Sequence, residues 1–142
     1  MAARIASLLF GLATVVALPA SADELAVIVH AKRDTQLNLE EVAQIYLKKR
    51  RFWPDGGKIV PVNRDSGSAA REAFVRSVFG SRVGQLVVYW NRQYFQGVLP
   101  PATLASDEAV RRFVAGEELA IGYVHPSVVD DSVRMVLHLD AP

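Results

Sequence analysis

The stretch IVPVNRDSGSAAREAF, residues 59–74, decides the fold because it holds a strand, a tight turn and the start of a helix in immediate succession. Ile59 to Val62 is a short apolar run of the kind that forms a buried strand. Ser66-Gly67-Ser68 predicts a turn that opens a helix. Small or apolar residues then recur at helical spacing, at Ala70, Ala73, Phe74, Ser77 and Val78. A strand that runs directly into a helix is the repeating unit of α/β domains.

Three further helices are predicted by apolar stripes that follow capping residues. One begins after Asn38, where Glu41 stands at capping-box spacing. The others are expected after Ser81 and after Ser106. The stripes are Leu39, Val42, Ala43, Tyr46 and Leu47 in the first, Val83, Leu86, Val87, Trp90 and Tyr94 in the second, and Val110, Phe113 and Val114, all expected to face inward, in the third.

The remaining apolar runs predict three more strands. LAVIV (25–29) and AIGYV (120–124) are uninterrupted, which is typical of strands buried on both faces. Residues 133–139 alternate, which predicts a half-buried edge strand whose direction stays open, with Val133, Met135, Leu137 and Leu139 on the apolar face. Because strands alternate with helices, we expect an α/β fold: a three-layer sandwich with a mixed, mostly parallel sheet and helices on both faces.

The first 22 residues have the features of a signal peptide. Arg4 precedes an uncharged apolar run from Ile5 to Leu18, and Ala20-Ser21-Ala22 forms a small-residue cleavage site. The run is shorter than the roughly 20 apolar residues that span a bilayer. We therefore expect cleavage after Ala22, a periplasmic protein with no membrane insertion after cleavage, and a single domain over residues 23–142.

Composition narrows the classes of function. The chain has 16 lysines and arginines against 15 acidic residues, and loss of Arg4 with the leader would make these numbers equal. A neutral domain is not typical of proteins whose main partner is nucleic acid. The sequence has no cysteine, which excludes disulfides and thiol chemistry. His30 and His125 could meet if their strands are neighbours, but neither cysteine nor clustered acids join them, so neither a metal site nor a cofactor is expected.

A candidate anion site follows the strand at 59–62. Ligands of open α/β sheets gather beyond the carboxyl ends of the parallel strands. A turn with Gly67 at a helix start offers unpaired N–H groups at the positive end of the helix dipole. The hydroxyls of Ser66 and Ser68 add donors, and the Arg64 guanidinium suits a tetrahedral oxyanion. The alternative is that the turn holds an ordinary serine cap and that Arg64 is an ordinary surface residue.

Several separated motifs resemble the phosphate-binding proteins of ABC transporters, members of the type II periplasmic binding protein superfamily. They are Ile45-Tyr46 near the end of a helix, Trp53 in a turn, Arg64 before Ser66-Gly67-Ser68, and Ile121-Gly122-Tyr123 in a strand. The motifs occur in the family's order and cover most of the chain after the leader. The resemblance implies the fold of one lobe of such a protein.

The same resemblance implies a phosphate site made by Arg64, Ser66, Gly67 and Ser68, with Arg71 one turn further on. It implies a solute-binding protein rather than an enzyme, with phosphate or a related oxyanion as ligand and an ABC permease or another envelope protein as partner. Two departures count against tight binding: the sequence has no counterpart of the family's first lobe, and Arg64 stands nearer to the turn than is usual. The alternative function is therefore an interaction module of the cell envelope that has lost tight ligand binding.

Two other features have simpler interpretations. Lys48 to Arg51 form a run of four positive charges at the end of the first helix. Cations there interact favourably with the negative end of the helix dipole. This interpretation is favoured over a docking patch. Trp53 and Trp90 are expected to pack in the core or along a groove.

Overall fold

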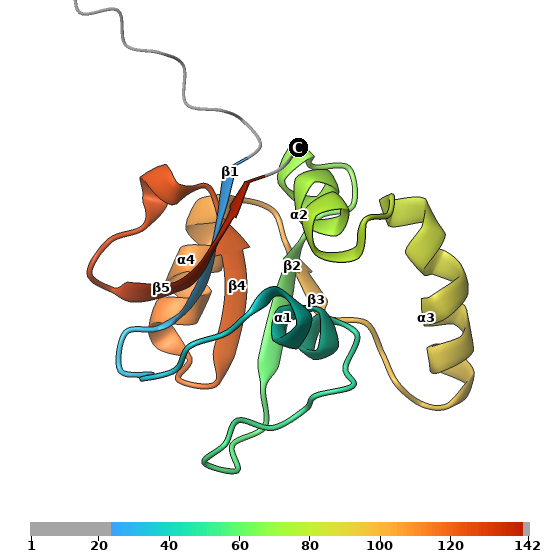
Figure 1. The fold of residues 1–142 in the computed structure, drawn as a ribbon, viewed down its shortest axis with the longest axis horizontal. Helices are drawn as coiled ribbons and strands as arrows, with labels where there is room; N and C mark the ends of the chain where they lie inside the picture. The colour runs from blue at the N-terminus through green and yellow to red at the C-terminus, as the bar shows by residue number, and fades with distance from the viewer. Residues whose placement is uncertain (1–23, 141–142) are drawn as a thin grey trace, which may run out of the picture.

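The computed structural model describes residues 24–140, so the expected signal peptide and its cleavage after Ala22 lie outside the described residues. The described part contains five strands and four α-helices (Figure 1). The strands are β1 Glu24–His30, β2 Val60–Arg64, β3 Ala102–Leu104, β4 Ala120–Val124 and β5 Val133–Asp140. The α-helices are α1 Leu39–Tyr46, α2 Ala69–Phe79, α3 Leu86–Phe95 and α4 Asp107–Gly116. None of these helices is long and apolar enough to cross a membrane.

The five strands form one sheet in the order β3-β2-β4-β1-β5. Strand β2 pairs in parallel with β3 and β4, whereas β1 runs antiparallel to both β4 and β5. The predicted mixed sheet and the predicted edge position of the last strand are confirmed. The strand that runs against the others is β1, which lies between β4 and β5. Strand β5 forms the edge next to it.

The reversal of β1 separates the two histidines that follow β1 and β4. Ala26 pairs with Val124, so β1 continues away from the carboxyl end of β4. His30 therefore lies at the opposite end of the sheet from His125. The expectation that the two could meet as strand neighbours is wrong, because it assumed that the strands run in the same direction.

Helices cover both faces of the sheet, as predicted. On one face, α1 and α2 bury Ile45 and Phe74 against β1 and β4, and the Phe74 ring stacks on that of Tyr123 with centroids 3.9 Å apart. On the other face, α4 buries Val110 and Val114. Gly122 in β4 permits this approach, since a Cβ added there would lie 2.5 Å from a methyl of Val110.

Several details differ from the predictions. The short strand β3 was not expected. Met135 is 48% exposed because a bulge in the β1–β5 pairing brings Val136 into the core instead. Phe113, expected to face inward, is 37% exposed.

Helix α3 is the largest departure. Its apolar stripe is typical of a packed helix, but no residue of α3 is buried. Figure 1 shows α3 standing apart from the two helical layers that cover the sheet. Val87 and Tyr94 of the predicted stripe are more than half exposed, as are Val88 and Phe95.

Candidate anion-binding site

The turn that joins β2 to α2 is organised by Ser68. Its hydroxyl donates to the carbonyl oxygen of Asp65 at 2.8 Å and accepts from the backbone N–H of Arg71 at 3.1 Å. Ser68 is thus the N-cap of α2. Because its hydroxyl proton is already used within the turn, this side chain has little left to offer a ligand.

The two residues before the cap are free at the backbone. Ser66 and Gly67 are exposed, and among the described residues no group accepts a hydrogen bond from either N–H. A Cβ added to Gly67 would meet nothing within 4 Å. Two adjacent unpaired N–H groups at a helix start form the kind of concavity that binds anions.

Arg71 lies in the first turn of α2 and is buried, with 8% of its surface exposed. One guanidinium nitrogen, Nη1, donates to the carbonyl oxygen of Arg64 at 3.4 Å, whereas Nε is buried with no partner. A buried donor without a partner is unusual and calls for an explanation. Arg71 therefore has one unsatisfied donor, which is buried in this conformation of the side chain.

Arg71 and Ser66 line a groove of about 450 Å³ between the turn and α3. Its other walls come from Asp65, from the residues around α3, and from the segment that leads into β3. These wall residues are Val83, Leu86, Val87, Trp90, Asn91, Pro100, Pro101 and Thr103. The groove offers a cation and hydroxyl on one side and an apolar wall on the other. Trp90 lies in this groove wall and Trp53 in the core, as predicted.

Arg64, the arginine expected beside the turn, is held elsewhere. Its side chain is 13% exposed, and its Nη1 pairs with the carboxylate of Asp107 at the start of α4. Nη2 donates to the carbonyl oxygen of Ala105 at 3.3 Å. Asp107 also accepts the backbone N–H of His125 at 3.0 Å. A carboxylate thus occupies the guanidinium edge at which an oxyanion would bind, and only the Nε of Arg64 is left without a partner.

Tyr123, in the neighbouring strand β4, holds the carboxyl end of β2 in place. Its hydroxyl accepts the backbone N–H of Arg64 at 3.1 Å and donates to Asn63 Oδ1 at 3.0 Å. Burial raises the pKa of Tyr123, and the nearby Arg64 and Arg71 only partly oppose this rise. The hydroxyl therefore stays a neutral donor that holds the strand end in place.

The five predicted site residues are neighbours in space with different tasks. Ser66 and Arg71 line the groove, Gly67 lies on the exposed turn, Ser68 caps α2, and Arg64 pairs across to α4. The sequence interpretation missed Asp107 as the partner of Arg64.

Another group of side chains, at the start of β1 and the end of β5, could present ligand atoms to a metal ion. One such atom each from Glu24, His138 and Asp140 lies within 4.8 Å of the others. His138 Nδ1 already lies 3.5 Å from a carboxylate oxygen of Asp140, and the two side chains are 42% and 83% exposed. Exposed acidic groups of this kind are common without a metal.

Comparison with solved structures identifies relatives for the fold. A protein described as a phosphate ABC transporter substrate-binding protein from Clostridium perfringens, solved with bound phosphate, is 31% identical, with a TM-score of 0.62. An ABC-type phosphate transport receptor from Vibrio cholerae is 20% identical with a TM-score of 0.63, and PstS from Borrelia burgdorferi is 15% identical with a TM-score of 0.61. Each match covers 79% of this chain and 43%, 44% and 46% of the respective relative.

The chain is similar to the phosphate-binding proteins of ABC transporters and has the fold of one of their lobes. It spans less than half the length of the three phosphate-binding proteins above, as expected for a single lobe. No protein-family model and no curated protein matches the sequence. The resemblance to phosphate-binding proteins drawn from the sequence motifs is thereby confirmed for the fold.

Proposed function

We propose that this domain binds phosphate or a related oxyanion in the periplasm, at the turn between β2 and α2, and serves ABC-type uptake or sensing. The observation that carries the proposal is the set of unused donors around one turn. These are the N–H groups of Ser66 and Gly67 and the buried Nε of Arg71. The bound phosphate in the relative that is 31% identical supports the same ligand class.

When an anion binds, Arg64 can either keep its ion pair with Asp107 or release Asp107 and pair with the ligand. In the first case the ligand meets only the turn and Arg71. In the second it gains a bidentate guanidinium at the cost of an ion pair. The groove is open, so the anion stays partly in water, where charge attraction is weak. We therefore expect weak affinity that falls as salt concentration rises.

The test is calorimetric titration of the purified protein with phosphate and sulfate. If the ligand takes Arg64 from Asp107, Arg64→Ala should weaken binding by about ten- to a hundredfold, as expected for loss of one hydrogen bond from a charged donor. Arg64→Lys should recover only part, because lysine cannot form the bidentate fork. Asp107→Asn should strengthen binding, because it removes the carboxylate that competes for Arg64 and still accepts the N–H of His125.

The outcomes separate the possibilities. Binding that is lost in Arg64→Ala and improved in Asp107→Asn supports the proposal with ligand exchange at Arg64. Binding that ignores both variants excludes exchange at Arg64 and leaves the ligand with the turn and Arg71 alone. No binding of phosphate or sulfate by the parent protein at millimolar concentration would refute oxyanion binding and favour protein–protein interaction.

Protein–protein interaction is the second candidate function, and helix α3 is the observation that favours it. Val87, Val88, Tyr94 and Phe95 present an apolar face whose only charged neighbour within the helix is Arg92. A second copy of the chain suits this face, because it brings the same apolar surface and because two copies contain about as much chain as the relative that is 31% identical. Light scattering after size-exclusion chromatography should then give twice the monomer mass, and Val88→Lys should restore the monomer. A monomeric parent protein at high concentration would refute self-association.

A further inference from the structure

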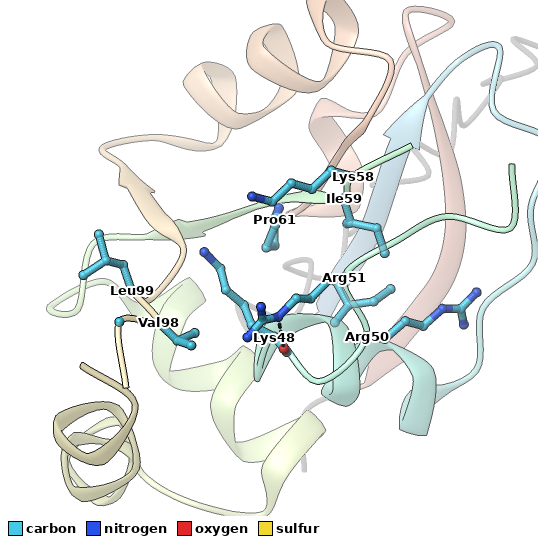
Figure 2. Close-up of a pocket in the computed structure, with 10 residues that line it drawn as sticks. Lys48, Arg50, Arg51, Lys58, Ile59, Pro61, Val98 and Leu99 are labelled. Atoms are coloured by element: carbon cyan, nitrogen blue, oxygen red, sulfur yellow. Dashed lines mark hydrogen bonds between the residues drawn. The ribbon is translucent and has the colours of Figure 1, made fainter. Parts of the chain in front are cut away.

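A second cavity, of about 250 Å³, lies at the opposite end of β2 from the candidate anion site (Figure 2). We call it the cationic cavity and define it by Lys48, Arg51 and Lys58 on its rim and by Ile45, Ile59, Pro61 and Leu99 among its apolar walls. It brings together the end of α1, the approach to β2 and the segment after α3. Three residues of the run, Lys48, Arg50 and Arg51, therefore line a cavity just past the end of α1.

Three of the four positively charged side chains that line the cationic cavity have no acidic partner in the described part of the chain. Within residues 24–140, no carboxylate forms an ion pair with Lys48, Arg51 or Lys58. Arg50 differs, because its guanidinium lies 3.0 Å from the carboxylate of Glu41. Figure 2 shows the amines of Lys48 and Lys58 projecting into the same space beside Pro61, with Arg50 turned away. The cavity therefore has an uncompensated positive rim.

Lys48 is held there against two unfavourable effects. Its backbone φ is 56°, in the left-handed region that favours glycine. Its pKa is lowered by partial burial and then by repulsion from Lys58 and Arg51. Strained residues and uncompensated charges of this kind gather at functional sites, where a ligand relieves them. An anion is the ligand that would relieve the repulsion.

The walls of the cavity add a requirement for apolar surface. Ile45 and Ile59 are buried in its base, and Leu99 is 58% exposed at its side. Inorganic ions gain nothing from such walls, whereas hydrocarbon does. The volume lies below the roughly 300–1,000 Å³ of pockets that hold drug-sized ligands. The fitting ligand is therefore small and combines an acidic group with hydrocarbon surface.

We propose that the cationic cavity binds a small amphiphilic anion, with its acidic group between Lys48 and Lys58 and a short hydrocarbon or aromatic body against Ile45, Ile59 and Leu99. This site is separate from the β2–α2 turn, and the proposal does not depend on phosphate binding there. The acidic group forms hydrogen bonds with the two amines, and the hydrocarbon body displaces water from the walls.

The probes are octanoate, acetate and 1-octanol, measured by calorimetry on the purified chain. Octanoate carries both required parts, acetate lacks the hydrocarbon and octanol lacks the charge. Octanoate should bind at least about tenfold more tightly than either. NMR amide shifts on adding octanoate should concentrate at residues 45–59 and 97–99. Equal affinity for octanoate and acetate, or shifts centred on residues 64–71, would overturn the proposal.

Variants test the two amines with a matched control. Lys58→Ala should weaken octanoate binding by about tenfold, as should Lys48→Gly, which also removes the strained side chain at the left-handed position. Lys49→Ala removes the neighbouring charge, which is exposed and does not line the cavity, and should leave affinity within about twofold. Octanoate binding that is equal in all three variants would refute the site. Phosphate titrations of the same variants should be unchanged, so failure here is distinguishable from failure at the turn.

Discussion

Positive charge is clustered at both ends of strand β2, but in the described chain it is paired with carboxylates at one end and mostly unpaired at the other. At the carboxyl end, the Arg64 guanidinium is paired with Asp107 and lies 3.6 Å from the Asp65 carboxylate. At the other end, Lys48 and Lys58 face the same cavity without a carboxylate partner in the described chain. The first arrangement neutralises a partly buried charge within the protein, whereas the second leaves positive charge available to a bound anion.

This difference affects what each end can bind. An anion at the turn competes with Asp107 for Arg64, although the N–H groups of Ser66 and Gly67 are free. An anion at the cationic cavity competes with no carboxylate of the described chain for Lys48 or Lys58. Family resemblance therefore points to the first site, while the balance of charges points to the second. Variants that measure folding and binding separately can distinguish a structural cation from one kept for a ligand.

The largest expected effect is on stability at the carboxyl end. Arg64→Ala should lower the free energy of unfolding by about 2–3 kcal/mol, because it leaves Asp107 partly buried without its cation. This value lies between the roughly 0–1 kcal/mol of an exposed pair and the roughly 3–5 kcal/mol of a fully buried one. Lys58→Ala, the matched change at the other end, should stay within about 0.5 kcal/mol. Urea denaturation of both variants measures the contrast.

A double-mutant cycle sharpens this result. If the pair is structural, Arg64→Ala combined with Asp107→Asn should cost less than the sum of the two single changes, because neither charge is then left alone. Additive costs would show that Arg64 and Asp107 are not coupled. A large loss of unfolding free energy in Lys58→Ala would show that this lysine stabilises the fold, contrary to the interpretation given above.

The second expected effect concerns two helices that end in the same backbone conformation. Gly80 follows α2 with φ of 61°, and Lys48 lies just past the end of α1 with φ of 56°. Gly80→Ala should cost about 1 kcal/mol, since space is open around it and only the backbone resists. Lys48→Gly should leave the free energy of unfolding unchanged or raise it by up to about 1 kcal/mol, through relief of backbone strain and of charge repulsion.

The control for this pair is Lys49→Gly. Lys49 has no positive φ, so glycine relieves nothing there and should destabilise the protein slightly. Thermal or urea unfolding compares the three variants. If Lys48→Gly and Lys49→Gly lose stability equally, the left-handed conformation at Lys48 carries no strain worth relieving, and one support for the cationic cavity falls.

Much of the fold could be predicted from the sequence because local signals agree with the final packing. The capping box at Asn38 is present, with Glu41 N–H donating to Asn38 Oδ1 at 2.9 Å and Asn38 N–H donating to Glu41 at 2.9 Å. Buried strands such as AIGYV were visible as apolar runs. Strand direction was not visible, because an apolar run is equally compatible with parallel and antiparallel neighbours. The reversal of β1 therefore required the structure.

The candidate site was less accessible from sequence for a related reason. Strand β3 has three residues, follows Pro100-Pro101 and is mostly exposed, so it shows neither a long apolar run nor alternation. In the structure Arg64 pairs with Leu104 of β3, which brings Asp107, three residues later, beside Arg64. Without β3, nothing in the sequence joins these two side chains. The cationic cavity was hidden likewise, since Lys58 and Leu99 meet Lys48 only through tertiary packing.

The smallest expected effect tests the one paired cation at the cavity. The pKa of Glu41 is lowered, chiefly because the Asn38 N–H donates to its carboxylate and also because of Arg50. A lowered folded-state pKa means that the stabilisation is present above the usual value of 4.5 and is lost as pH falls through the folded-state pKa. Glu41→Gln keeps an acceptor for Asn38, so it should cost at most about 0.5 kcal/mol at pH 7 and flatten stability in that acid range.

The same Glu41→Gln change releases Arg50 from its carboxylate, and Arg50, now turned away, could swing toward the cationic cavity that it borders. If uncompensated charge is what attracts an amphiphilic anion, octanoate should bind about twofold more tightly to this variant at low salt, and the gain should vanish as salt is added. Unfolding curves between pH 3 and pH 7 and calorimetry at two salt concentrations measure both parts. Weaker octanoate binding in Glu41→Gln would mean that the Glu41–Arg50 pair shapes the cavity wall, and that charge alone does not distinguish the two ends of β2.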